Sequence, residues 1–297
     1  FVVDCAATET RSNLDSTIPL HTLGKGHFQA TRRLARILSD ERPDVTLSAV
    51  GGSNTKILAA IALSGVETRP IISYHGYEEW KSGLLSLATY LALPMLSAAS
   101  ARTVAVSDGL RDALLTTLRA SNQKTVAIHN PVFFPETTRV PTASELRGRE
   151  EIILAVGRFV SQKDYPTMIR AFARLKRPNA RLVILGKGPG QPNVARQVAS
   201  LGLADRVSMP GYLSDPWSAY ETAKCFVLCS RSEPFGNVVV EALAHGLPVV
   251  ATACSGPLEI LQHGRYGKIV PVGDDLQLAD AMNATLKLGG ENYVLWG

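Results

Sequence analysis

The chain has few cysteines and few aromatic residues. Its four cysteines stand at positions 5, 225, 229 and 254, with no Cys-x-x-Cys pair, and its six histidines are not clustered. This pattern argues against a zinc site and a disulfide framework and predicts reduced, buried thiols. Aromatic residues make up 6% of the chain and no nucleic-acid-binding motif is present. Base-stacking surfaces, and with them a nucleic-acid partner, are therefore not expected.

Long hydrophobic runs are also scarce. The stretch Ser82–Ser100 carries no charged residue, but it barely reaches the length of a membrane span and contains Pro94 with many small and hydroxyl residues. A buried helix pair is the prediction, and a surface that dips into a membrane interface is the alternative. The chain opens on FVVDCAA, which reads as a strand and carries no export signal.

What is present is the composition of an α/β protein. The 297 residues are 45% hydrophobic and 19% charged, with 24 glycines and 17 prolines. Such a chain can form two cores of roughly 130 to 150 residues each. The formal net charge of +5 favours an anionic partner, but it does not choose among a nucleotide, a nucleic acid and an anionic membrane.

Apolar strand-like segments alternate with helical patterns along the whole chain. Because strands that alternate with helices in short steps form parallel sheets, ligands are expected at the carboxyl ends of these strands. A proline-containing loop near Pro131 marks the predicted junction between two domains. The predicted strands are 44–50, 69–75, 102–107, 151–157, 181–186, 206–211, 225–229 and 247–253, and helical patterns cover 28–40 and 53–65. A further strand is predicted at the start of the segment 124–150, ahead of the proline-containing loop.

The segment SRSEPFGNVVVEALAHGLPVV, residues 230–250, carries the strongest functional signal. Two carboxylates, Glu233 and Glu241, flank a Phe-Gly-Asn turn that opens a helix between two apolar strands. The first turn of a helix offers free N–H groups and the positive end of the helix dipole, which together bind anions. Glu241 lies about 6 Å along the axis from Asn237 at 1.5 Å per residue. This is roughly the gap between a diphosphate and the ribose of one nucleotide. Two solvated carboxylates in an ordinary turn are the alternative interpretation.

Two cations follow the strand at 151–157. In VGRFVSQKDYP, Arg158 comes directly after the strand and Lys163 precedes a helix that Asp164 is expected to cap. Two fixed cations at a strand end would neutralise a diphosphate without a metal ion. No Asp-x-Asp motif occurs in the chain, so no metal site is predicted. A surface pair of basic residues is the alternative.

Two further loops give weaker signals. The cluster GKGPG, Gly186–Gly190, follows a strand, where glycine serves either a tight turn or a close approach of the backbone to a nucleotide. The loop ACSGPLEI, with Ser255, Gly256 and Glu259, reads mainly as a turn and a helix cap.

The Glu233-to-Glu241 motif, together with Arg158 and Lys163, resembles the retaining glycosyltransferases of family 4 (the glycosyl transferases group 1 family). The resemblance is strong over about 151–283 and weaker before it. It implies an α/β fold of two Rossmann-like, doubly wound parallel-sheet domains that face each other across a cleft (GT-B). The expected extents are an acceptor domain at 1–131, a donor domain at 132–285 and a segment at 286–297 that returns to the first domain. Relative to the family, the first strand, the glycine-rich loop and the first helix are expected to be missing from this sequence.

The resemblance also implies roles for individual residues. Glu233 would bind sugar hydroxyls and Glu241 the ribose, while Arg158 and Lys163 hold the donor phosphates and stabilise charge on the departing nucleotide. The remaining expected contacts are His75 with the donor sugar, and Phe235, Gly236, Asn237, Leu213 and Gly188 with the nucleotide. Leu213 stands in PGYLSD, 210–215, which resembles the family loop whose backbone faces the base. Of these, Glu233, Arg158, Lys163 and His75 are the predicted catalytic residues. The configuration at the transferred carbon would be retained by attack of the acceptor on the face that the phosphate leaves.

The predicted activity is transfer of a sugar from a nucleoside-diphosphate sugar, with UDP-sugars favoured, to a saccharide or lipid-linked acceptor, without cofactor or metal. A cytoplasmic location is expected, with peripheral contact to an anionic membrane left open. Two alternatives remain: a non-catalytic module that binds nucleotide sugars, and another GT-B enzyme such as a phosphorylase or a nucleotide-sugar epimerase. A phosphorylase would need a lysine that holds pyridoxal phosphate.

Overall fold

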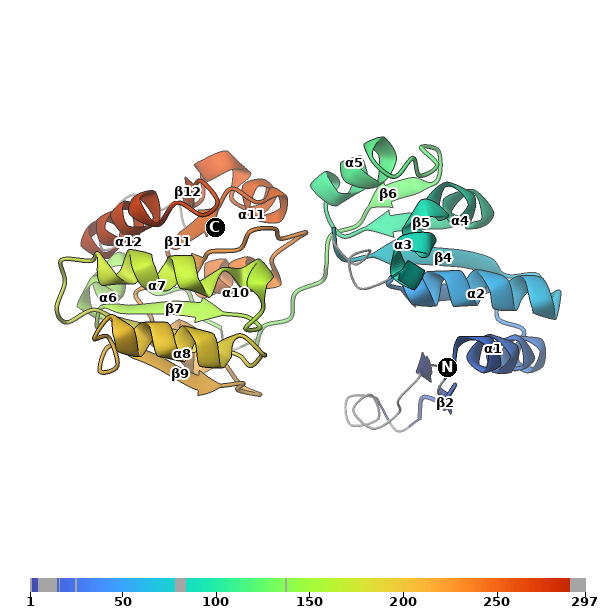
Figure 1. Ribbon diagram of the computed structural model, residues 1–297, viewed down its shortest axis with the longest axis horizontal. Helices are drawn as coiled ribbons and strands as arrows, with labels where there is room; N and C mark the ends of the chain where they lie inside the picture. The colour runs from blue at the N-terminus through green and yellow to red at the C-terminus, as the bar shows by residue number, and fades with distance from the viewer. Residues whose placement is uncertain are drawn as a thin grey trace. The chain divides into compact units, whose positions relative to one another are not determined.

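The computed structural model describes residues 2–4, 15, 17–24, 26–77, 84–136 and 138–288. The chain divides into two compact units, Phe1–His129 (unit 1) and Asn130–Gly297 (unit 2). Each unit consists of parallel strands and the helices that cover them (Figure 1). The predicted α/β class with two parallel sheets is therefore confirmed.

Unit 1 contains a four-stranded parallel sheet in the order β3-β4-β5-β6. A further parallel pair, β1 with β2, forms a separate small sheet. The strands predicted at 44–50, 69–75 and 102–107 are confirmed within one or two residues at their ends, and strands are also present in the opening segment and at the start of 124–150, as predicted. The strands are β1 (Val2–Asp4), β2 (Leu20–Thr22), β3 (Val45–Ala49), β4 (Arg69–Tyr74), β5 (Arg102–Ala105) and β6 (Thr125–Ala127).

The uncharged stretch at 82–100 forms a helix pair from residue 84 onward, but the predicted burial of this pair is wrong in part, because Leu91 and Met95 are 73% and 76% exposed. The second helix has Pro94 in its first turn, where the missing N–H of proline costs no hydrogen bond. Among the helices that the structure describes, none is long and apolar enough to span a bilayer. The helices of unit 1 are α1 (His27–Glu41), α2 (Gly51–Ser64), α3 (Leu84–Leu91), α4 (Leu93–Ala99) and α5 (Asp108–Thr116).

Unit 2 contains a parallel sheet whose six described strands run in the order β12-β11-β10-β7-β8-β9. All five strands predicted for this half are present, whereas β2 in unit 1 and β12 here have no counterpart among the predicted strands. The strands are β7 (Ile152–Val156), β8 (Arg181–Leu185), β9 (Val207–Gly211), β10 (Cys225–Leu228), β11 (Val249–Thr252) and β12 (Lys268–Val270).

Helices cover both faces of this sheet. Along β10 the side chains alternate: Cys225 and Val227 enter the core shared with α7, α8 and α12, and Phe226 and Leu228 enter the core shared with α9 and α10. A strand buried on both faces explains the uninterrupted apolar run CFVLC. The helices are α6 (Ala143–Gly148), α7 (Tyr165–Ala173), α8 (Gln191–Ser200), α9 (Trp217–Thr222), α10 (Asn237–Ala244), α11 (Ser255–Ile260) and α12 (Asp275–Leu288).

The strand order of unit 2 places one crossing point in the sheet. From β7 the chain proceeds outward to β8 and β9, then returns to the other side of β7 to form β10. In open parallel sheets, ligands bind beyond the carboxyl ends of the strands at such a switch point. The loops after β7 and β10 are therefore the expected binding position, and they carry Arg158, Lys163 and Glu233.

Candidate functional site

The loops after β7 and β10 are joined by main-chain and side-chain hydrogen bonds. Gln162 Nε2 donates to the carbonyl of Ser232 at 2.7 Å, and the amide of Arg231 donates to the carbonyl of Gln162 at 2.7 Å. Because each loop fixes the backbone of the other, the side chains that they carry are held in register across the switch point.

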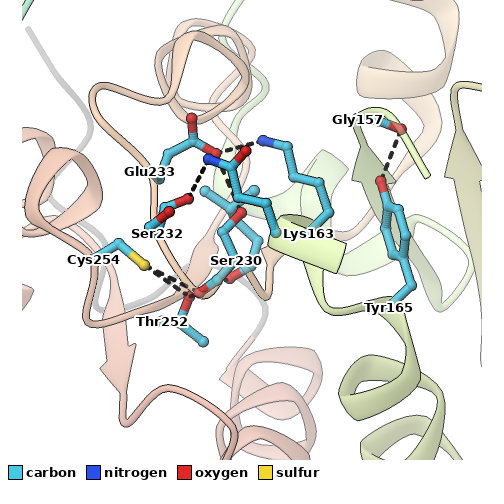
Figure 2. Close-up of polar contacts among 10 residues, drawn as sticks. Gly157, Lys163, Tyr165, Ser230, Ser232, Glu233, Thr252 and Cys254 are labelled. Atoms are coloured by element: carbon cyan, nitrogen blue, oxygen red, sulfur yellow. Dashed lines mark hydrogen bonds and ion pairs between the residues drawn. The ribbon is translucent and has the colours of Figure 1, made fainter. Parts of the chain in front are cut away.

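The main contact across this point is an ion pair between Lys163 and Glu233 (Figure 2). The Lys163 ammonium donates to Glu233 Oε2, and only 15% and 12% of the two side chains are exposed. Ser230 Oγ donates to the same carboxylate oxygen at 3.2 Å. The structure thus brings together two residues to which the sequence assigns different parts of a donor, the phosphates and the sugar.

Ser230 is itself held by the neighbouring strand. Its carbonyl accepts from Thr252 Oγ1 at 2.6 Å and from the Cys254 thiol at 3.1 Å (Figure 2). Cys225, Cys229 and Cys254 are buried and form no disulfide, and burial raises the pKa of the Cys229 thiol to about 12. These thiols are protonated at neutral pH and act as packing and hydrogen-bonding groups.

The first turn of α10 lies directly beside Glu233. Gly236 is the cap residue of this helix, with a φ of 105°, and as a glycine it has no side chain that could cap the turn. A Cβ on Gly236 would lie 3.4 Å from Glu233 Cγ. Within unit 2, Asn130 Nδ2 donates to Asn237 Oδ1 at 3.1 Å. The positive end of the α10 dipole therefore opens next to the Lys163–Glu233 pair.

Phe235 and Gly256 show why this turn is closely packed. Phe235 is 7% exposed, so its ring belongs to the core. A Cβ on Gly256 would lie 2.0 Å from the Phe235 carbonyl oxygen, and the Gly256 amide donates to the Glu233 carbonyl at 3.0 Å. The loop at 254–256 thus supports the backbone on which Glu233 stands.

Arg158 lies one residue after Gly157, whose α-carbon faces the Lys163 stem. A Cβ on Gly157 would lie 3.2 Å from Lys163 Cε, and Tyr165 Oη donates to the Gly157 carbonyl at 2.9 Å (Figure 2). The Arg158 side chain is exposed, and no partner for its guanidinium is found among the described residues. Its donors are therefore accessible at the carboxyl end of β7.

The expected side-chain cap by Asp164 is wrong. Asp164 stands at the cap position of α7 with a φ of 45°, but its carboxylate makes no capping hydrogen bond. It instead forms an ion pair with Arg231, with Asp164 Oδ2 3.1 Å from Arg231 Nε. This pair is a further link between the loops after β7 and β10, and local helix-start chemistry did not predict it.

The GKGPG cluster serves the packing of two neighbouring loops. A Cβ on Gly186 would lie 2.1 Å from the Gly157 carbonyl oxygen, and one on Gly188 would lie 2.6 Å from the Phe159 carbonyl oxygen. Glycine is needed at both positions because the backbones after β7 and β8 are in direct contact. Leu213, in the loop after β9, is 38% exposed. Contacts of Gly188 and Leu213 with a nucleotide remain predictions.

This packing predicts a large loss of stability for Gly186→Ala. The new Cβ would meet a carbonyl oxygen, and φ at Gly186 is 135°, which side chains rarely adopt. We expect the free energy of unfolding to fall by at least about 2 kcal/mol. Gly202→Ala is the matched control, because its φ is 66° but nothing lies within 4 Å of a new Cβ. Urea unfolding of both variants measures the difference, and equal losses would contradict the close contact.

Glu241 is held from two sides. Tyr220 Oη, on α9, donates to Glu241 Oε2 at 2.5 Å. The His245 ring faces Tyr220 with centroids 5.1 Å apart, and His245 Nδ1 lies 2.8 Å from the Glu241 carbonyl. Burial raises the pKa of the Glu241 carboxyl, and the Tyr220 hydrogen bond opposes this shift. Neither Tyr220 nor His245 was predicted, since no local pattern links them to Glu241.

His75 lies in unit 1, at the carboxyl end of β4, and its side chain is exposed. Its Nε2 lies 3.1 Å from Ser73 Oγ, which donates its own proton to the Ser48 carbonyl at 3.0 Å. We therefore assign the proton of a neutral His75 ring to Nε2, which leaves Nδ1 as an acceptor. An acceptor nitrogen is compatible with the predicted hydrogen bond to a sugar hydroxyl.

The chemistry available in unit 2 is recognition of an anion and of hydroxyl groups. Arg158, Lys163 and the first turn of α10 supply positive charge, while Glu233 and Glu241 supply acceptors for hydroxyl donors. Preorganised donors of this kind stabilise negative charge that develops on a leaving group.

Family models match both halves of the chain. The glycosyl transferases group 1 family matches residues 137–294, and glycosyltransferase family 4 matches residues 9–133. LpsE, a lipopolysaccharide core biosynthesis glycosyltransferase of Rhizobium meliloti, is 37% identical over 123 residues, covering 41% of this chain and 36% of that protein. The uncharacterised glycosyltransferase MJ1059 of Methanocaldococcus jannaschii is 26% identical over 250 residues, covering 79% of this chain and 62% of that protein. The chain thus spans about a third to two thirds of these relatives.

Solved structures show the same fold over nearly the whole chain. Anabaena Alr3699/HepE, crystallised with UDP and glucose, matches with a TM-score of 0.81 at 18% identity, covering 98% of this chain and 84% of that one. The lipopolysaccharide outer core galactosyltransferase WaaB matches with a TM-score of 0.72 at 19% identity, covering 94% and 82%. Because the family match covers more than half of the 297 residues, the chain belongs to the glycosyl transferases group 1 family and has the GT-B type of fold.

Proposed function

We propose that this chain acts as a retaining glycosyltransferase that takes its sugar from a nucleoside-diphosphate sugar and uses no metal ion. The observation that carries the proposal is the Lys163–Glu233 pair beside the first turn of α10, at the switch point of the sheet in unit 2. Family membership and the UDP complexes of Alr3699/HepE support a nucleotide-sugar donor, with UDP-sugars favoured.

In this proposal the cations act on the leaving group. Arg158 and Lys163 neutralise the diphosphate together with the first-turn amides at Phe235–Asn237, and they stabilise the charge that grows as the anomeric bond breaks. Glu233 accepts hydrogen bonds from sugar hydroxyls, and its contact with Lys163 couples sugar recognition to phosphate recognition. These cations and the helix dipole carry the positive charge that a metal ion supplies in other transferases.

The proposed reaction retains the configuration of the sugar. The acceptor hydroxyl attacks the anomeric carbon on the face that the diphosphate leaves, so a new carbon–oxygen bond forms as the carbon–phosphate-oxygen bond breaks. The acceptor proton passes to the departing phosphate oxygen. His75 orients the donor sugar by accepting a hydroxyl hydrogen bond and does not act as the nucleophile.

A saccharide or a lipid-linked molecule is the proposed acceptor, used at the cytoplasmic face of a membrane. Unit 1 supports this choice, because the helix pair α3–α4 exposes large apolar side chains. Leu91 is 73% exposed and Met95 is 76% exposed, in a stretch without charge. Peripheral contact with an anionic membrane through this face is part of the proposal.

The first test is a thermal-shift screen with UDP-, GDP- and ADP-sugars. The proposal expects one nucleotide to raise the melting temperature, followed by transfer to a saccharide acceptor that persists in EDTA and gives a product of unchanged anomeric configuration. Binding without transfer or hydrolysis would favour a non-catalytic module. Turnover of the nucleotide sugar without an acceptor would favour an epimerase.

The role proposed for Glu241 gives a separate prediction. Glu241→Ala should weaken nucleoside-diphosphate binding by about tenfold or more, because a hydrogen bond to a charged group contributes about 1.5–3 kcal/mol. Calorimetric titration with UDP measures the change. Glu221→Ala is the control, since Glu221 is an exposed glutamate of α9. Equal affinities in both variants would remove the assignment of Glu241 to the ribose.

A further inference from the structure

Tyr220 is buried and has its hydroxyl directed at a single acceptor. It is 0% exposed on the short helix α9, and its Oη donates to Glu241 Oε2 at 2.5 Å. Because Oε2 of Glu241 accepts this hydrogen bond from the phenol, that oxygen is already occupied. Among the described residues, no other side chain donates to the Glu241 carboxylate, so Oε1 is left for a ligand.

The position of Tyr220 is set by a group of stacked rings. The Tyr220 ring stacks with Phe226 and with His245, at centroid distances of 6.0 and 5.1 Å. The His245 ring also stacks with Trp217, with centroids 5.5 Å apart and 8° between the ring planes. A ring packed in this way has few alternative rotamers. The hydroxyl is therefore preorganised, and it restricts the carboxylate that it contacts.

His245 fixes the main chain of Glu241 at the same time. A carbonyl oxygen only accepts, so the 2.8 Å contact between His245 Nδ1 and the Glu241 carbonyl assigns the ring proton to Nδ1. Both ends of Glu241 are thus anchored to the aromatic group: the carboxylate through Tyr220 and the backbone through His245.

This group also connects two parts of the nucleoside site. Helix α9 follows the loop 212–216 that leaves β9, and Asp215 Oδ1 accepts from the Trp217 amide at 3.3 Å. Leu213, in the same loop, is the residue expected to face the base. Tyr220 therefore links the element expected at the base with the carboxylate expected at the ribose, through one hydrogen bond across α9 and α10.

We propose that Tyr220 is a positioning residue that makes donor binding depend on the ribose hydroxyls, so that the site accepts ribonucleoside diphosphates and rejects their 2′- and 3′-deoxy analogues. The inference rests on the proposed function, in which Glu241 binds the ribose. A carboxylate held at one oxygen presents the other in a fixed direction, and a ligand that lacks the matching hydroxyl leaves that acceptor without a donor.

The test is calorimetric titration of UDP, 2′-deoxy-UDP and 3′-deoxy-UDP into the whole chain and its Tyr220→Phe variant. The unchanged chain should bind UDP about tenfold or more tightly than at least one deoxy analogue. In Tyr220→Phe, the affinity for UDP should fall about tenfold, while the affinity for that analogue should change less than about twofold. With a UDP-sugar as substrate, KM should rise by the same factor and kcat should stay within about twofold, because the phosphate contacts are intact.

Phe226→Leu is the matched control, because it removes packing against the same ring but no hydroxyl. It should lower the melting temperature and keep the preference for UDP. An equal loss for all three ligands in Tyr220→Phe, or an unchanged preference, would overturn the role of Tyr220 alone. If the unchanged chain binds UDP and both deoxy analogues alike, or binds none of them, the assignment of Glu241 to the ribose of a uridine donor fails as well.

Discussion

Replacement of Arg158 by alanine should lower kcat by about 10²- to 10³-fold and change donor affinity far less. Arg158 follows the carboxyl end of β7, its side chain is exposed, and the preceding residue, Gly157, faces the Lys163 stem. A donor aimed at a leaving diphosphate acts mainly where negative charge develops, and removing one such donor from an enzyme typically has an effect of this size. Steady-state kinetics with a UDP-sugar, together with calorimetric titration of UDP, separate turnover from binding.

The matched control for charge is Arg196→Ala, since Arg196 is an exposed arginine of α8 whose guanidinium contacts Asn193 at 2.5 Å. It should leave kcat unchanged. The kcat of Arg158→Lys should lie between those of Arg158→Ala and Arg196→Ala, because lysine keeps the positive charge but lacks the planar paired donors of arginine. Unchanged turnover in Arg158→Ala would remove this residue from the catalytic group.

Lys163→Met should destabilise unit 2 by about 3 kcal/mol and also reduce turnover. Among the residues that the structure describes, the Glu233 carboxylate would keep one hydrogen-bond donor, the Ser230 hydroxyl at 3.2 Å, while 12% of its side chain is exposed. Breaking a buried ion pair by removing one partner costs about 3–5 kcal/mol, because the remaining charge is uncompensated. Urea unfolding followed by circular dichroism gives the stability, and transfer assays give the activity.

The double variant Lys163→Met/Glu233→Gln distinguishes the pair from its parts. Its loss of stability should be smaller than the sum of the two single losses, because the neutral amide needs no cation. Arg139→Met is the control: the Arg139 and Glu145 side chains are 69% and 45% exposed, so breaking that pair should change stability little. Additive losses at Lys163 and Glu233 would contradict an energetic coupling between them.

Local patterns were sufficient to predict most strands of both sheets. Segments such as CFVLC and LPVVATA are continuous apolar runs, which is typical of strands covered on both faces. β12 is harder to detect because Lys268–Val270 is short and bears a lysine, and its place in the sheet comes from pairing with β11. Parallel strands also predict that their following loops share one edge, and this suffices to group Arg158, Lys163 and Glu233 near one another.

Contacts between distant segments were not predictable in this way. Asp164 has the sequence position of a helix cap, but its carboxylate instead pairs with Arg231, which is 67 residues away. Tyr220 and Glu241 are 21 residues apart, and their contact depends on how α9 packs against α10. The glycines at 186 and 188 are explained only by the backbone that they approach. Each of these features needs a tertiary neighbour that no local propensity specifies.

The separation of β7 from β10 along the chain determines when a growing chain can first bind nucleotide. Lys163 and Glu233 are 70 residues apart, and β8 and β9 are synthesised before β10, the strand that pairs with β7. A growing polypeptide that stops before β10 contains Arg158 and Lys163 but lacks Glu233 and the first turn of α10, so its binding site is incomplete. Affinity for nucleotide should thus emerge in one step once α10 has been synthesised, and ligand-protected fractions in a pulse-chase experiment would count only chains that extend through α10.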